Sequence, residues 1–108
     1  MTDAIWHRLA GVHPTKSTYP TRATLDDESI IVLRTKHGFR GVERACPHMH
    51  AAMMDAQLVG DETMIRCPRH AFTFRLNDGK GVNCPGFRLG VFEIKEENDE
   101  LYGRRRAD

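Results

Sequence analysis

Short runs of β-branched residues, or of alternating apolar and polar residues, dominate the hydrophobic pattern of this chain. Alternation with a period of two is typical of β-strands, in which successive side chains point to opposite faces. The pattern predicts strands over residues 6–9, 29–34, 39–44, 63–66, 72–74, 91–95 and 100–102. Only residues 51–54, Ala-Ala-Met-Met, are expected to form a helical turn. Strands this short, with turn signals between them, favour an all-β fold, a small antiparallel sandwich or barrel.

The segments between these strands carry residues that favour tight turns. Residues 60–62 are Gly-Asp-Glu and residues 77–79 are Asn-Asp-Gly, and Asn98-Asp99 is expected to close the last hairpin. Neither an internal repeat nor a low-complexity linker divides the chain. The sequence therefore predicts a single domain over residues 1–108.

Composition narrows the class of protein. The chain has 108 residues, of which 40% are hydrophobic, and its formal net charge is +1. Such a charge offers no basic excess to neutralise phosphates, so no nucleic-acid partner is expected. No apolar run approaches the length of a membrane span, and the first residues lack the charged start and apolar stretch of a secretory signal. We therefore expect no membrane association and a cytoplasmic location, where the three cysteines stay reduced.

Two short motifs concentrate the metal-binding residue types. They are Cys46-Pro47-His48 and Cys67-Pro68-Arg69-His70, and eighteen residues separate His48 from Cys67. Each motif offers one thiolate and one imidazole. Two such halves can hold one zinc ion, or a [2Fe–2S] cluster with both cysteines on one iron and both histidines on the other. The order Cys, His, Cys, His favours the cluster, because common zinc fingers present a cysteine pair and then a histidine pair.

On these residues the chain resembles Rieske-type ferredoxins, the small electron carriers of bacterial oxygenase systems. The resemblance extends from Trp6 to about Tyr102 and is most specific in the two motifs and in the stretch from Phe72 to Gly79. It implies a Rieske-type fold in which two loops, about residues 45–54 and 66–74, form a cluster-binding subdomain. Residues 83–86, Asn-Cys-Pro-Gly, correspond to the proline-containing loop that covers the cluster in this family.

The chain departs from the family pattern inside both loops. Many members have glycine two residues after the first ligand histidine and directly after the second, where this chain has His50 and Ala71. Because glycine tolerates left-handed backbone, the fine geometry of both loops is in question. Arg69 stands where an aromatic residue is frequent. Ala51 and Arg69 also occupy the positions at which the high-potential branch forms a disulfide, so this chain has no such bridge.

The resemblance implies an electron-transfer component without catalytic residues of its own. Cys46, His48, Cys67 and His70 are the expected ligands of the [2Fe–2S] cluster. The expected partners are a flavin-dependent reductase, which supplies electrons, and a Rieske non-haem iron oxygenase, which receives them. Two alternatives remain open: a Rieske small subunit of an assimilatory nitrite reductase, and a zinc-stabilised interaction module.

Three further expectations concern residues beside the ligands. Cys84 is expected to be a small buried residue that is not needed for the cluster. His7, His13 and His37 are expected to be solvated or satisfied by local partners. The tip that carries the ligand histidines, with Arg69 and His50 beside them, is the hypothetical docking surface for partners.

Overall fold

The computed structural model describes residues 5–47, 50–69 and 71–106. Within them the secondary structure is nine strands and one short 3₁₀ helix. The strands are β1 (His7–Arg8), β2 (Thr21–Leu25), β3 (Glu28–Thr35), β4 (Gly38–Glu43), β5 (Gln57–Val59), β6 (Met64–Arg66), β7 (Thr73–Arg75), β8 (Val91–Glu97) and β9 (Glu100–Arg105), and the helix is η1 (Met53–Asp55). The predicted all-β fold is confirmed. No helix among the described residues has the length and apolar character needed to cross a membrane.

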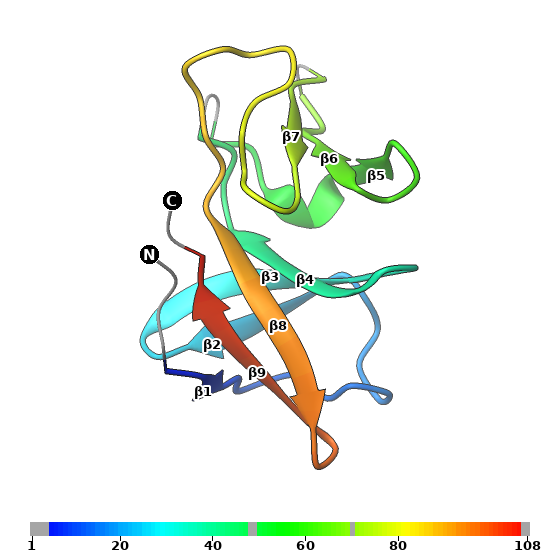
Figure 1. Cartoon of the computed structure of the whole chain (residues 1–108), viewed down its shortest axis with the longest axis vertical. Helices are drawn as coiled ribbons and strands as arrows, with labels where there is room; N and C mark the ends of the chain where they lie inside the picture. The colour runs from blue at the N-terminus through cyan, green and yellow to red at the C-terminus, as the bar shows by residue number, and fades with distance from the viewer. Residues whose placement is uncertain (1–4, 48–49, 70, 107–108) are drawn as a thin grey trace.

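Two antiparallel sheets divide the described chain into a base and a small subdomain (Figure 1). The base sheet has the strand order β1-β9-β8-β4-β3-β2, and the second sheet has the order β5-β6-β7. The chain leaves the base at the end of β4 and returns to it at the start of β8, and these two strands are hydrogen-bonded neighbours. Residues 44–90 between them form the small subdomain. It lies at one end of the molecule, and the turn between β8 and β9 lies at the other (Figure 1).

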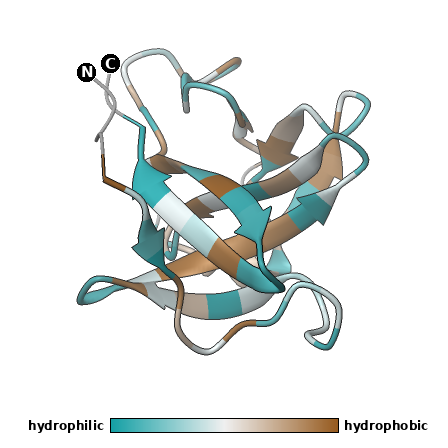
Figure 2. Ribbon diagram, turned by 60° about the horizontal axis from the view of Figure 1, so that its bottom comes forward, coloured by the Kyte–Doolittle hydropathy of each residue, from teal (hydrophilic) through white to brown (hydrophobic). Residues whose placement is uncertain are grey.

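Strand β3 is buried on both faces. Because each face packs into a different core, the strand connects the two parts of the molecule. Its alternating side chains send Ile30 and Val32 into a core with Leu25 and Phe92 of the base. Ile31 and Leu33, which point the other way, enter a second core with buried residues of the small subdomain. Four apolar residues accordingly follow one another along β3, from Ile30 to Leu33, and hydrophobic bands cross strands of the molecule in Figure 2. An unbroken apolar run is typical of a strand covered on both sides.

Some elements differ from the sequence-based expectation. Strand β2 was not predicted, although Ala23 and Leu25 alternate with polar residues and are buried. Its apolar residues are too few to stand out from the surrounding loop. The short strand β5 was also missed, because it is recognisable only by its pairing with β6. The helical turn expected at residues 51–54 is present as η1.

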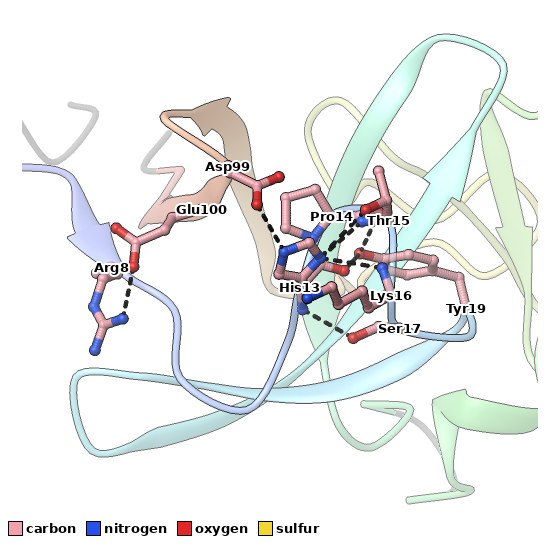
Figure 3. Close-up of polar contacts among 9 residues, drawn as sticks. All are labelled: Arg8, His13, Pro14, Thr15, Lys16, Ser17, Tyr19, Asp99 and Glu100. Carbon is pink, nitrogen blue, oxygen red and sulfur yellow. Dashed lines mark hydrogen bonds and ion pairs between the residues drawn. The ribbon is translucent and has the colours of Figure 1, made fainter.

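A set of hydrogen bonds ties the N-terminal loop to the turn between β8 and β9 (Figure 3). The Nδ1 atom of His13 accepts from the backbone N–H groups of Thr15 and Lys16, at 3.2 and 3.1 Å. Because Nδ1 is an acceptor, the proton lies on Nε2, which donates to the Asp99 carboxylate at 3.0 Å. His13 is therefore satisfied by partners within the protein, as expected.

A second tie joins the small subdomain to the turn between β3 and β4. The Lys36 side chain donates to the Asp61 carboxylate, and its backbone N–H donates to Glu62 at 2.8 Å. His37 Nε2 lies 2.9 Å from the backbone oxygen of Asp61. The hydrogen bond from Lys36 lowers the pKa of Asp61, and the same bond raises the pKa of Lys36. These contacts hold a turn in which Gly60, Asp61 and Glu62 all have positive φ.

Candidate functional site

The first loop, residues 45–52, begins where β4 ends and turns the chain back on itself. Ala45 and Ala52 pair across an isolated antiparallel bridge. Inside that bridge, the Cys46 N–H donates to the Ala51 oxygen at 2.9 Å, and the His50 N–H donates to the Cys46 oxygen at 2.8 Å. The loop therefore closes tightly, with Cys46 at 0% exposure and His50 exposed.

The second loop, residues 67–72, repeats this hydrogen-bond pattern between β6 and β7. The Cys67 N–H donates to the Phe72 oxygen at 2.7 Å, which is again a bond from the cysteine to the residue five positions later. Cys67 is 1% exposed. Ala71, four positions after its cysteine, has a φ of 57°, and His50, four positions after Cys46, has a φ of 58°. The two loops thus present a buried cysteine in the same local geometry.

His50 and Ala71 are the two positions where glycine was expected from the family pattern. Both adopt the left-handed backbone that glycine would favour. A side chain in that conformation costs about 1–2 kcal/mol per residue. The hydrogen bonds across each loop offset this cost, so the loops keep the left-handed turn without glycine.

Residues 80–88, which we call the covering loop, fold over the second loop through the side chain of Asn83. Its Oδ1 accepts from the Thr73 N–H at 2.9 Å, and its Nδ2 donates to the Ala71 oxygen at 3.1 Å. Beside it, the Val82 N–H donates to the Thr73 oxygen at 2.8 Å. The amide of Asn83 therefore pairs with backbone on both sides of Phe72, as a neighbouring strand would. The sequence analysis placed this loop but missed the role of Asn83.

Cys84 belongs to the covering loop, but its side chain is buried, with 4% exposure. Its Sγ lies 3.9 Å from the Thr73 oxygen, and burial raises the pKa of the thiol. It belongs to the same core as Cys46 and Cys67. The space around it is tight, because a Cβ at Gly81 would come within 2.7 Å of its sulfur. Cys84 is thus a small buried residue, as expected, and it remains protonated at neutral pH.

The structure describes the two cysteines of the expected ligand set but not the two histidines. Cys46, Cys67 and Cys84 are all buried, and the first two lie on the matched loops. His48 and His70 lie outside the described residues. In the described ranges, no three or more His, Cys, Asp or Glu side chains gather into a metal site. Two buried sulfur donors on twin loops fit the cysteine half of a [2Fe–2S] site, and coordination by the two histidines stays a prediction.

Comparison with known proteins places these loops in a family. The family model of the Rieske [2Fe-2S] domain matches residues 5–93. No curated protein matches the chain.

Solved structures share the fold. One is the complex of reduced oxygenase and oxidized ferredoxin in carbazole 1,9a-dioxygenase, with 24% identity and a TM-score of 0.72 over 98% of this chain and 100% of the matched one. Another is the ferredoxin of carbazole 1,9a-dioxygenase from Nocardioides aromaticivorans IC177, with 17% identity and a TM-score of 0.74 over 95% and 100%. A third is a putative nitrite reductase NADPH small subunit, with 15% identity and a TM-score of 0.72 over 95% and 99%. These identities show likeness of fold.

Proposed function

The chain belongs to the Rieske [2Fe–2S] domain family, and on that premise we propose that it is a one-electron carrier of an oxygenase system. Its cofactor is the [2Fe–2S] cluster of that family. We propose that Cys46 and Cys67 bind one iron and that His48 and His70 bind the other. The observation that supports this assignment best is the pair of matched loops, each of which buries its cysteine in the same hydrogen-bonded turn.

When bound, such a cluster takes up and releases a single electron. Two thiolates and two neutral imidazoles leave the oxidised cluster formally uncharged, whereas four thiolates leave it at minus two. An electron is easier to add to the uncharged form, so histidine ligation raises the potential. The protein contributes the dry surroundings of the two cysteines, which lie in a core with Ile65, Phe74 and Leu89.

The role of a carrier is supported by likeness of fold as well as by the family, because the chain covers all of the ferredoxin of carbazole 1,9a-dioxygenase. The structure of an oxygenase in complex with its ferredoxin supports the proposal that a Rieske non-haem iron oxygenase receives the electron. We propose a flavin-dependent reductase as the donor. Partners would approach beside the exposed His50 and Arg69.

A second candidate function rests on a different neighbour. The chain covers 99% of a putative nitrite reductase small subunit, at a TM-score of 0.72. In that role it would be a fixed subunit of a larger reductase rather than a carrier that diffuses between partners. The zinc-stabilised module considered from the motifs alone is set aside, because the family carries an iron–sulfur cluster.

A one-electron redox cycle tests the proposed function. The purified holoprotein should be red-brown, should contain two irons per chain, and should take up one electron per chain from a reductant and return it to an acceptor. The reduced protein should then lose its electron to an oxygenase component of the same organism. A protein that cycles but is reoxidised only by nitrite reductase would favour the second candidate. Failure to take up an electron reversibly would exclude both.

A further inference from the structure

A cavity lies where the base meets the small subdomain, and it has a volume of about 370 Å³. Its wall combines His37 and Arg40, from the β3–β4 turn and from β4, with residues 62–64 and 75–77 of the small subdomain. Figure 1 shows the turn between β3 and β4 and the turn between β5 and β6 on the same side of the molecule. The volume falls at the lower end of the range for small-molecule sites.

The cavity is remote from the two cysteine loops. Met64, which lines it, is the first residue of β6, whereas Cys67 follows the last residue of that strand. Arg75, which also lines it, is the last residue of β7, whereas Phe72 of the second loop precedes that strand. The two strands therefore separate the cavity from the proposed cluster site.

Arg40 gives this wall a positive charge that the protein does not pair. Its Nη1 donates to the Phe39 oxygen at 2.8 Å, and no carboxylate of the described residues lies within ion-pair distance of its guanidinium. The residue opposite Arg40 on β8 is Glu93, but that carboxylate lies 3.4 Å from Nε of Arg104. A guanidinium has several N–H donors, so most of those of this half-buried side chain remain for a ligand.

The other charged groups of the wall have partners within the protein. Nη2 of Arg75 lies 3.3 Å from Oδ2 of Asp78. Oε1 of Glu62 accepts from the Lys36 backbone N–H at 2.8 Å, and the tie described above engages His37. An anion entering the cavity would therefore meet one uncommitted cation.

Apolar side chains and an amide surround that cation. Leu76 is 4% exposed, and Met64 is half-buried and able to adapt to the shape of a ligand. The side-chain amide of Asn77 has no hydrogen bond to the described residues. Arg40, Leu76 and Asn77 also line a second cavity of about 260 Å³ beside β8. The free donors thus lie between two spaces that have apolar walls.

We propose that the cavity at Arg40 binds a small anion in which a carboxylate is joined to a short apolar body. The carboxylate would accept from Arg40, because a planar guanidinium matches the two oxygens of a carboxylate, and from Asn77. The apolar body would lie against Met64 and Leu76. Such a ligand would contact the base and the small subdomain together and would stabilise their junction. This binding site is separate from the cluster and from the proposed electron transfer.

Titration of the holoprotein with hexanoate near neutral pH tests the proposal. Calorimetry should show one site per chain with a Kd of about 1 mM or tighter. Tm should rise with hexanoate concentration, because a ligand that binds only the folded protein stabilises it. Acetate has the charge without the apolar body, and 1-hexanol has the apolar body without the charge. Each should bind about tenfold more weakly than hexanoate, or weaker still.

Substitution of Arg40 locates the site. Arg40→Gln should weaken hexanoate binding about tenfold or more, because it removes a charge-assisted hydrogen bond. Arg40→Lys keeps the charge without the planar fork and should lose less. The matched control is Arg22→Gln, which removes the same charge from an exposed position of β2, outside both cavities. The Tm of each variant is compared with and without hexanoate, so that a change in basal stability does not mimic a change in binding.

The outcomes separate this site from other modes of binding. Wild type that does not bind hexanoate, or an Arg40→Gln variant that binds it as well as Arg22→Gln does, would overturn the proposal. Acetate that binds as tightly as hexanoate would overturn the role of the apolar walls. The visible spectrum of the cluster should stay unchanged on titration. A spectrum that changes with the same Kd would place the anion at the cluster instead, and the proposed electron transfer would be unaffected by any of these results.

Discussion

Replacing Asn83 with alanine removes both side-chain hydrogen bonds between the covering loop and the second loop. The Thr73 N–H loses its acceptor at 2.9 Å, and the Ala71 oxygen loses its donor at 3.1 Å. The two losses differ in consequence. The Ala71 oxygen keeps a contact with the Thr73 hydroxyl at 3.3 Å, whereas the Thr73 N–H belongs to a buried residue with 8% exposure.

The expected loss in the free energy of unfolding follows from this difference. A hydrogen bond contributes about 0.5–1.5 kcal/mol net, and a donor left buried without a partner costs about 1–3 kcal/mol. Asn83 itself is exposed, so water can reach part of the site and the lower ends of these ranges apply. We expect Asn83→Ala to lower the free energy of unfolding by about 1–2 kcal/mol. For a chain of this size that corresponds to a fall in Tm of roughly 5–10 °C.

Two measurements check this prediction. Thermal unfolding of the holoprotein gives the change in Tm, and hydrogen exchange gives the protection of the Thr73 amide, which should drop in Asn83→Ala. Asn83→Asp keeps the acceptor but loses the donor, so it should protect Thr73 and still weaken the contact with Ala71. Asn77→Ala, an exposed amide of the same subdomain, is the control. Equal effects of Asn77→Ala and Asn83→Ala on Tm and on Thr73 exchange would refute the reasoning.

Three further predictions concern other parts of the molecule. Cys84→Ser should retain the Rieske spin-resonance signal, because Cys84 is a buried thiol that the ligand assignment does not use; purification without the signal would show the assignment to be wrong. The midpoint potential measured by voltammetry near neutral pH should lie at the low end of the Rieske range of about −150 to +300 mV, because Phe72 in the second loop offers no side-chain donor to a cluster sulfur and the loop disulfide of the high-potential branch is absent. A value above roughly +100 mV would contradict this. Asp61→Asn should lower Tm only within a limited pH window. Because the pKa of Asp61 is lowered in the folded protein, the stabilisation by the ion pair is lost as the pH falls through the pKa of Asp61. Because the pKa of Lys36 is raised, the same stabilisation is lost as the pH rises through the pKa of Lys36. The Tm gap from wild type should therefore be present from about pH 4 to about pH 10 and close as the pH falls below or rises above that window, and a gap independent of pH would exclude the ion pair as its cause.

The sequence predicts the parts of this fold that depend on local pattern. Strands β3, β4, β8 and β9 follow from apolar runs and turn residues, and they lie where those patterns occur. The positions of the two left-handed turns were also indicated, as places where glycine was expected. The sequence pattern does not predict that His50 and Ala71 adopt left-handed backbone, because backbone hydrogen bonds across each loop hold them in that conformation.

The role of Asn83 was hidden for a related reason. Its partners Ala71 and Thr73 lie ten or more positions earlier in the chain. From the sequence alone, an asparagine before Cys-Pro-Gly cannot be told from an ordinary loop residue. Lys80 and Arg88 likewise meet across an isolated bridge although they lie eight positions apart. Contacts of this kind follow from the folded arrangement and not from residue type.

The most direct test of the central claim is to count the histidine nitrogens on the reduced cluster. The holoprotein would be prepared with ¹⁵N in its histidines only, and the electron-spin-echo or ENDOR spectrum of the reduced state would be compared with that of unlabelled protein. Coordination by His48 and His70 predicts two strongly coupled nitrogens, both changed by the label, with one lost in a variant of either residue that retains a cluster. A reduced cluster without strongly coupled histidine nitrogen, or a colourless protein that contains zinc, would contradict the assignment.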